Sequence, residues 1–138
     1  HHAVGAAAAR AVIRIMKEEK LVENSAAMGA YLGQKLRHTF SEQPHIGDIR
    51  GRGLFWGLEL VADRETKRPF PAQKHLAWEI WQAAFARGLI IYYSQGCADG
   101  VNGDLIMLGP PLIINRAQVD EMVGILAEAV ADVLGRSG

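Results

Sequence analysis

Two segments in the first third of the chain, Ala3 to Glu19 and Leu21 to Glu42, place apolar residues every three or four positions. The first is rich in alanine, and the second carries a stripe of large apolar side chains. This spacing in segments of good helix formers predicts two amphipathic helices. Pro44 follows the second segment and is expected to end it.

The pattern changes to alternation between Ile49 and Val61, which predicts one β-strand with a buried face and an open face. The glycines at 51, 53 and 57 predict a bulge or a close backbone approach within that strand. A dinucleotide-binding loop needs the spacing G-x-G-x-x-G at the start of a helix. The spacing here is G-x-G-x-x-x-G and leads into a strand, so phosphate binding is disfavoured. The residues of the buried face are expected to be Leu54, Trp56, Leu58 and Leu60.

The remaining segments are shorter and are separated by glycine, proline and polar residues. We expect a loop at Asp63–Pro71, a helix at Ala72–Arg87 ended by Gly88, strands at Leu89–Tyr93 and Asp104–Leu108 around a loop at Ser94–Gly103, and a helix that begins at Asn115. Asn115 and Gln118 have the spacing of a capping box. The sequence therefore predicts an α+β fold, with a small, mostly antiparallel sheet of about three to four strands packed against helices.

The composition of the chain argues against several classes of protein function. The chain has 15 Lys and Arg and 15 Asp and Glu residues, so its net charge is zero. Nucleic-acid and membrane-surface binders carry a basic excess, which is missing here. No segment reaches the roughly 18 continuous apolar residues of a membrane span. The single cysteine, Cys97, cannot form an internal disulfide, and this predicts a reducing, cytoplasmic location.

Residues that could carry chemistry are present but have no suitable spacing. The histidines lack the spacings of zinc sites, and Cys97 has no basic neighbour that would make it a thiolate. The carboxylates show no pairing that suggests acid–base catalysis. We therefore expect no metal site and no catalytic or cofactor-binding residue in this chain. The groups considered are His1, His2, His38, His45, His75, Asp63, Glu65 and Asp104.

Four segments of the sequence match motifs of a known protein family and follow one another in the same order as in that family. They are His2-Ala3-Val4 before the alanine-rich helix, Gly47–Phe70, Ala86–Ile90 and Asp99–Ile114. Together they resemble the C-terminal small domain of class III aminotransferases, fold type I enzymes that use pyridoxal 5′-phosphate. The resemblance covers essentially residues 1–138, with residues 1–43 as helices that link to a large domain.

The resemblance implies a homodimeric enzyme that transfers an amino group from an amine, an ω-amino acid or an amino acid to a keto acid. The family's reactive lysine and most cofactor contacts belong to the large domain. We therefore expect this chain alone to be inactive and not to bind pyridoxal phosphate covalently. No lysine of this chain occupies the position of the family's reactive lysine. The lysines compared are Lys17, Lys20, Lys35, Lys67 and Lys74.

The resemblance also implies a substrate side, formed by the loop from Gln95 to Gly103 and by Met107. Relatives often carry a carboxylate-binding arginine where this chain has Asn102 or Met107. These two residues are therefore the substrate-side candidates, and their identities favour amine or ω-amino substrates, or an arginine supplied from elsewhere. The alternative is a stand-alone, non-catalytic interaction or dimerisation module, whose apolar face would need a cover.

Overall fold

Four helices and a four-stranded antiparallel sheet make up the described part of the chain, which confirms the predicted α+β class. The structure is a computed structural model that describes residues 2–135, so His1 lies outside the described residues. The elements are α1 (Ala3–Glu18), α2 (Leu21–Thr39), β1 (Ile46–Arg52), β2 (Phe55–Leu60), a 3-10 turn η1 (Ala72–Lys74), α3 (Leu76–Ala86), β3 (Tyr92–Gln95), β4 (Asp104–Leu108) and α4 (Arg116–Leu134).

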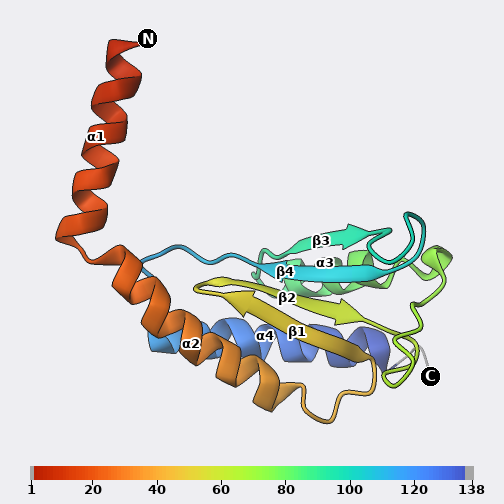
Figure 1. Cartoon of the computed structure of the whole chain (residues 1–138). Helices are drawn as coiled ribbons and strands as arrows, with labels where there is room; N and C mark the ends of the chain where they lie inside the picture. The colour runs from red at the N-terminus through yellow and green to blue at the C-terminus, as the bar shows by residue number, and fades with distance from the viewer. Residues whose placement is uncertain (1, 136–138) are drawn as a thin grey trace.

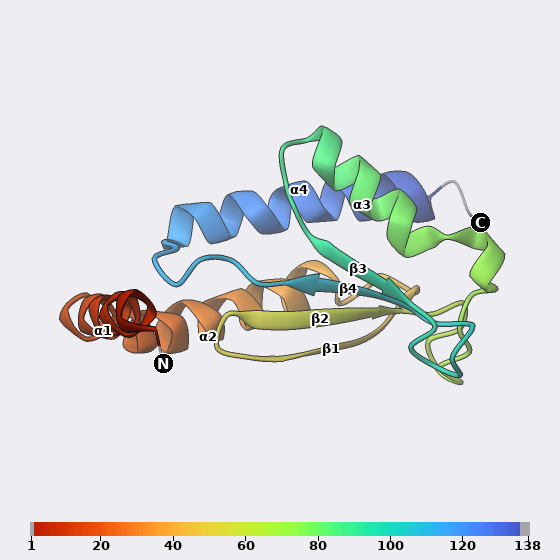
Figure 2. The ribbon, with the colours of Figure 1, turned by 90° about the horizontal axis from the view of Figure 1, so that it is seen from above.

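The sheet has the strand order β1-β2-β4-β3, and every neighbouring pair is antiparallel. Helices α2, α3 and α4 pack on one face of the sheet, and none of the described helices covers the other face (Figures 1 and 2). The core lies between these two layers, because one face of each strand and one stripe of each helix are apolar. Its fully buried members include Leu32, Leu36, Leu58, Leu60, Ile80, Ile106, Val119 and Leu126.

Helix α1 stands away from the rest of the chain (Figure 1). None of its residues is buried, although the predicted helix is confirmed almost to the residue. An amphipathic helix normally buries its apolar stripe against another element. Within the described residues this stripe has no cover, and its exposed members are Val4, Val12, Ile13 and Ile15.

The single strand predicted at Ile49–Val61 is wrong, because β1 and β2 form a hairpin there. Gly53 lies in the turn with φ +56°, a conformation that glycine adopts without steric cost. The alternation of Leu54 to Leu60 predicted β2 and its buried face correctly. The register shift of the hairpin lies at Gly47, between Ile46 and Asp48, and not at these glycines. The other predicted possibility, a close backbone approach, is confirmed at Gly51, where an added Cβ would lie 2.4 Å from the Phe55 oxygen.

Three other boundaries differ from the prediction, and two helix ends agree with it. Helix α2 ends at Thr39 rather than at Glu42, so it stops before Pro44. The helix expected at Ala72–Arg87 is interrupted at His75, which has φ +49°. Strand β3 begins at Tyr92 rather than at Leu89. Gly88 has φ +87° after α3, as expected of a helix-ending glycine. The capping box of α4 is confirmed, because Asn115 Oδ1 accepts from the Gln118 N–H over 3.0 Å.

Candidate functional site

The strand register defines the residues of the uncovered sheet face. Arg50 pairs with Gly57, Gly57 pairs with Met107, and Met107 pairs with Tyr92, so these four residues form one row across all strands. Side chains alternate between the two faces along a strand, so strand residues two positions before or after these four also lie on this face. Met107, a substrate-side candidate, is half-buried on the uncovered face in β4, one of the two central strands, beside the position where Gly57 has no side chain.

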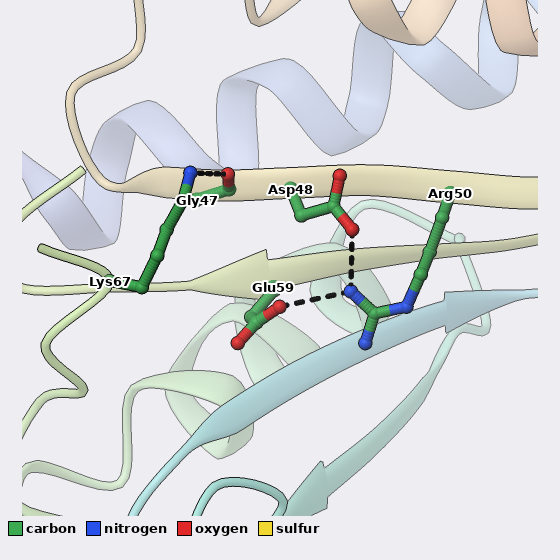
Figure 3. A network of polar contacts seen from close by, with 5 residues as sticks. All are labelled: Gly47, Asp48, Arg50, Glu59 and Lys67. Carbon is green, nitrogen blue, oxygen red and sulfur yellow. Dashed lines mark hydrogen bonds and ion pairs between the residues drawn. The ribbon is translucent and has the colours of Figure 1, made fainter. Parts of the chain in front are cut away.

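A polar group occupies the β1 and β2 side of this face. One nitrogen of the Arg50 guanidinium donates to Asp48 over 2.7 Å and to Glu59 over 2.9 Å (Figure 3). The hydrogen bonds that Arg50 donates, first to Asp48 and then to Glu59, raise the pKa of Arg50. This arginine is therefore held by two carboxylates of its own sheet. Arg52, opposite Phe55 in the register, is exposed at the end of the hairpin.

Lys67 lies in the loop that follows β2. Its Nζ donates to the backbone oxygen of Gly47, at the register shift of β1 (Figure 3). Lys67 thus connects the loop after β2 with the start of β1.

An apolar hollow lies on the β3 and β4 side. Its volume is about 380 Å³, and its wall includes Phe55, Tyr92 and Met107. Phe55 is 63% and Tyr92 64% exposed. Gly109 lies against the Phe55 ring, where an added Cβ would be 3.7 Å from the ring. Two open aromatic rings beside a methionine form an apolar surface that can pack against an apolar group.

Asn102, the other substrate-side candidate, lies before β4, whereas Met107 lies near the other end of that strand. Both the nitrogen and the oxygen of the Asn102 side-chain amide form a hydrogen bond. Its Nδ2 donates to Asp99 Oδ2 over 2.9 Å, and its Oδ1 accepts from the Ala72 N–H over 3.0 Å. Hydrogen bonds from Asn102 are also the main cause of the lowered pKa of Asp99. The structure therefore places the two candidates at opposite ends of one strand.

The sequence did not single out Phe55, and it named Gln95 only as the first residue of the predicted substrate-side loop. It treated Asp104 as an ordinary strand-end carboxylate. Asp104 is in fact 99% buried, with a relative exposure of 1%. Its Oδ1 accepts from Gln95 Nε2 over 3.1 Å and from the Ala77 N–H over 3.3 Å. The partners lie 9 and 27 residues away in the chain, so no short motif could have shown this role.

The described lysines do not have the surroundings of a lysine that forms a Schiff base. A lysine that forms a Schiff base is normally desolvated or close to another cation, which lowers its pKa. Here Lys35 lies 2.9 Å from Asp120 and has a raised pKa, mainly because of that hydrogen bond. Lys67 is bound to Gly47, and Lys74 lies over the Phe70 ring. Lys17 and Lys20 are exposed.

Other sites are also missing from residues 2–135. No group of three or more His, Cys, Asp or Glu side chains there could hold a metal ion. Cys97 is exposed and lies 3.5 Å from Ser94 Oγ. None of the described helices has the length and apolar character needed to cross a membrane.

Comparison with known proteins gives a consistent result. Residues 2–130 match the family described as aminotransferase class-III. An uncharacterized aminotransferase of Schizosaccharomyces pombe is 41% identical over 133 residues, which are 96% of this chain and 29% of that protein. A taurine–pyruvate aminotransferase of Rhodobacter capsulatus is 41% identical over 118 residues, 86% of this chain and 25% of that protein.

A solved structure from a study of transaminase evolution by ancestral reconstruction has the same fold. It superposes with a TM-score of 0.86 at 38% identity, over 95% of this chain and 27% of that chain. The chain thus spans little more than a quarter of the length of these relatives. Because the match covers nearly all of this chain in sequence and in fold, the chain belongs to the class III aminotransferase family.

Proposed function

We propose that this chain is the C-terminal small domain of a class III aminotransferase, with residues 1–43 as the helices that link it to a large domain. The complete enzyme transfers an amino group from an amine, an ω-amino acid or an amino acid to a keto acid. One observation carries the proposal: the match extends along almost the whole chain but covers only 29% of the Schizosaccharomyces pombe relative. The partners implied are the large domain, a second subunit, the amino donor and the keto acid.

Pyridoxal phosphate is the cofactor of this family, and we place its binding outside the present residues. When bound, it acts as an electron sink during amino transfer. The lysines described above are exposed or engaged with other groups, which supports this placement. Residues 1–138 alone are accordingly inactive.

The uncovered sheet face is the side that we assign to the substrate. Met107 lies on this face in β4, one of the two central strands, and the hollow beside it is walled by Phe55 and Tyr92. This wall excludes water from the adjacent part of a bound amine and favours an apolar substituent there. Arg50 is tied to Asp48 and Glu59, so a carboxylate on the substrate would have to displace those partners or bind another arginine.

The test uses the full-length protein that contains this chain. With pyridoxal phosphate and pyruvate as acceptor, a panel of aliphatic amines, aryl-alkyl amines and ω-amino acids should yield alanine from at least one donor. Residues 1–138 should give no alanine and no specific borohydride-trapped adduct at one lysine. A full-length protein that binds the cofactor but transfers no amino group from any donor contradicts the proposal. Stable self-association without cofactor binding would instead support the non-catalytic module.

A further inference from the structure

The loop between β3 and β4, residues Gly96–Gly103, is ordered by its own backbone. The N–H of Ala98 donates to the Asn102 oxygen over 3.0 Å, and the N–H of Gly100 donates to the Gly96 oxygen over 3.0 Å. Gly103 has φ +102°, and a Cβ there would be 2.6 Å from the Ala98 nitrogen. Glycine is therefore required at the point where the loop returns to β4.

Side chains then fix this loop to a neighbouring segment. Asn102 joins Asp99 inside the loop to the backbone N–H of Ala72 in η1, with distances of 2.9 and 3.0 Å. Asp99 Oδ1 also accepts from the N–H groups of Val101 and Asn102 over 2.9 and 2.7 Å. One amide side chain thus connects the conformation of the loop with its attachment to η1.

A second attachment lies at the base of the loop. Buried Asp104 accepts from Gln95 Nε2 and from the Ala77 N–H in the first turn of α3. Gln95 also lies 3.3 Å from the His75 ring nitrogen and 3.5 Å from the Ala72 oxygen. Because α3 has no side-chain cap from its own N-cap residue, Asp104 supplies one acceptor for its free N–H groups.

We propose that Asn102 and Asp104 are positioning residues that hold the Gly96–Gly103 loop against η1 and α3, and that this attachment preforms the substrate side of the enzyme. The inference rests on the proposed aminotransferase function. Asn102 acts through Asp99 and Ala72 and does not contact the substrate itself. This assignment replaces the expectation that its side chain faces the substrate, since each end of its amide already has a hydrogen-bond partner.

A preformed loop lowers the entropic cost of substrate binding, because the backbone is already ordered before the substrate arrives. Release of the loop should therefore weaken binding of the ground state and the transition state alike. Such a loss raises KM and leaves kcat nearly unchanged. A group that acted on the reacting atoms would instead lower kcat.

The test compares three variants of the full-length protein. Asn102→Asp keeps an acceptor for the Ala72 N–H but sets a second carboxylate against Asp99. Asp99→Asn with Asn102→Asp restores a donor and acceptor pair in the reverse direction. Gln73→Glu makes the same amide-to-carboxylate change on an exposed neighbour of Ala72 and is the matched control.

Amide hydrogen exchange over residues 72–77 and 96–104 is measured together with steady-state kinetics. In Asn102→Asp, repulsion between the two carboxylates should open the loop, so exchange of the Val101 N–H, which donates to Asp99 Oδ1, should become about tenfold faster. KM for the donor should rise by roughly three- to tenfold with kcat within about twofold. The double variant should return both values toward those of the unaltered protein. Gln73→Glu should change neither.

Unchanged exchange in Asn102→Asp would show that the attachment does not hold the loop, whatever the activity. Faster exchange with an unchanged KM would show that the loop is held but does not position the substrate, and this also overturns the inference. Failure of the proposed function looks different, since the unaltered protein would then transfer no amino group although its loop exchanges slowly.

Discussion

Gly29 of α2 lies directly against the backbone carbonyl of Gly53 in the β1–β2 turn. A Cβ on Gly29 would be only 2.0 Å from the Gly53 oxygen. One turn further along α2, a Cβ on Gly33 would be 2.2 Å from the Trp56 ring. The two glycines thus let α2 approach the hairpin closely, and this contact fixes the end of the hairpin that carries Arg52 and Phe55 on the uncovered face.

Gly29→Ala should destabilise the chain, because the new methyl group would overlap backbone atoms that cannot rotate away. Overpacking of this kind costs about 1–3 kcal/mol. Gly124, in α4, is the matched control, since nothing lies within 4 Å of a Cβ there. Gly124→Ala should stabilise the chain by about 0.5–1 kcal/mol through helix propensity. Urea unfolding of both variants measures the two effects, and equal signs would contradict the close approach.

Asn115→Ala should remove the cap of α4. The Asn115 side chain accepts from the Gln118 N–H, and the Gln118 side chain accepts from the Asn115 N–H over 3.1 Å. Loss of such a cap costs about 0.5–2 kcal/mol. Gln118→Ala removes only the return bond, so its effect in urea unfolding should be smaller. A larger effect of Gln118→Ala would contradict the assignment of Asn115 as the main cap.

The pair formed by Tyr31 and Asp120 should make stability depend on pH. The Tyr31 hydroxyl donates to Asp120 Oδ1 over 2.6 Å. This bond, followed by that from Lys35, lowers the pKa of Asp120 below its ordinary 3.8. The contribution of Asp120 to folding stability is therefore complete at pH values above its ordinary pKa. It is lost as the pH falls through the lowered pKa of the folded state. The raised pKa of Tyr31, caused first by the same bond, predicts a further loss at alkaline pH, as pH rises through that value.

Asp120→Asn should reduce the loss of stability between neutral and strongly acidic pH. Urea unfolding midpoints from pH 2 to pH 7 measure the change. Glu121→Gln, next to it and exposed, is the control and should leave the acid limb as it is. An identical acid limb in the unaltered chain and in Asp120→Asn would mean that Asp120 titrates normally in the folded state.

Arg50→Met should weaken the chain slightly and in a salt-dependent way. The Arg50 side chain is 58% exposed, and exposed ion pairs contribute only about 0.2–1 kcal/mol. Salt at 1 M screens such pairs, so the difference from the unaltered chain should shrink. Arg52→Met changes an exposed arginine two positions away whose side chain makes no hydrogen bond or ion pair within residues 2–135, and it should show no salt-dependent effect. Equal salt dependence in the two variants would contradict the role of Asp48 and Glu59.

Local sequence patterns predicted a helix or strand well where the spacing of apolar residues was regular or a capping residue marked its start. Helical spacing predicted α1 and α4, and Asn115 predicted the start of α4. The alternation from Leu54 onward predicted the buried face of β2. The hairpin was missed because β1 carries charged and glycine residues instead of alternating apolar ones. Its turn also lacks the Asn-Gly or Asp-Gly pair that usually marks a two-residue connection.

The site was less predictable, because its contacts join residues that are far apart in the chain. Asn102 and Ala72 are 30 positions apart, and Asp104 and Ala77 are 27. Spacing within a motif carries no information about such pairs. The family resemblance pointed to Met107, but only the strand register placed Gly57 and Tyr92 beside it.

Met107→Arg should change which donors the full-length enzyme accepts. The new guanidinium would lie beside Gly57, whose missing side chain leaves room, and beside the wall formed by Phe55 and Tyr92. A planar guanidinium binds a carboxylate through two parallel hydrogen bonds. The ratio of kcat/KM for an ω-amino acid to that for an uncharged amine of equal length should therefore rise about tenfold, the gain expected of one charge-assisted contact.

Met107→Leu keeps an apolar side chain of similar volume and is the control for this change. It should leave the donor ratio within about twofold, because volume-conserving apolar substitutions perturb packing little. Cofactor absorbance and thermal unfolding of both variants check that the large domain and the fold are intact. If Met107→Arg lowers kcat/KM for charged and uncharged donors by the same factor, Met107 does not face the donor, and the uncovered sheet face is not the substrate side. A selective rise for the charged donor would place the substituent of the amine beside Met107, within reach of Tyr92.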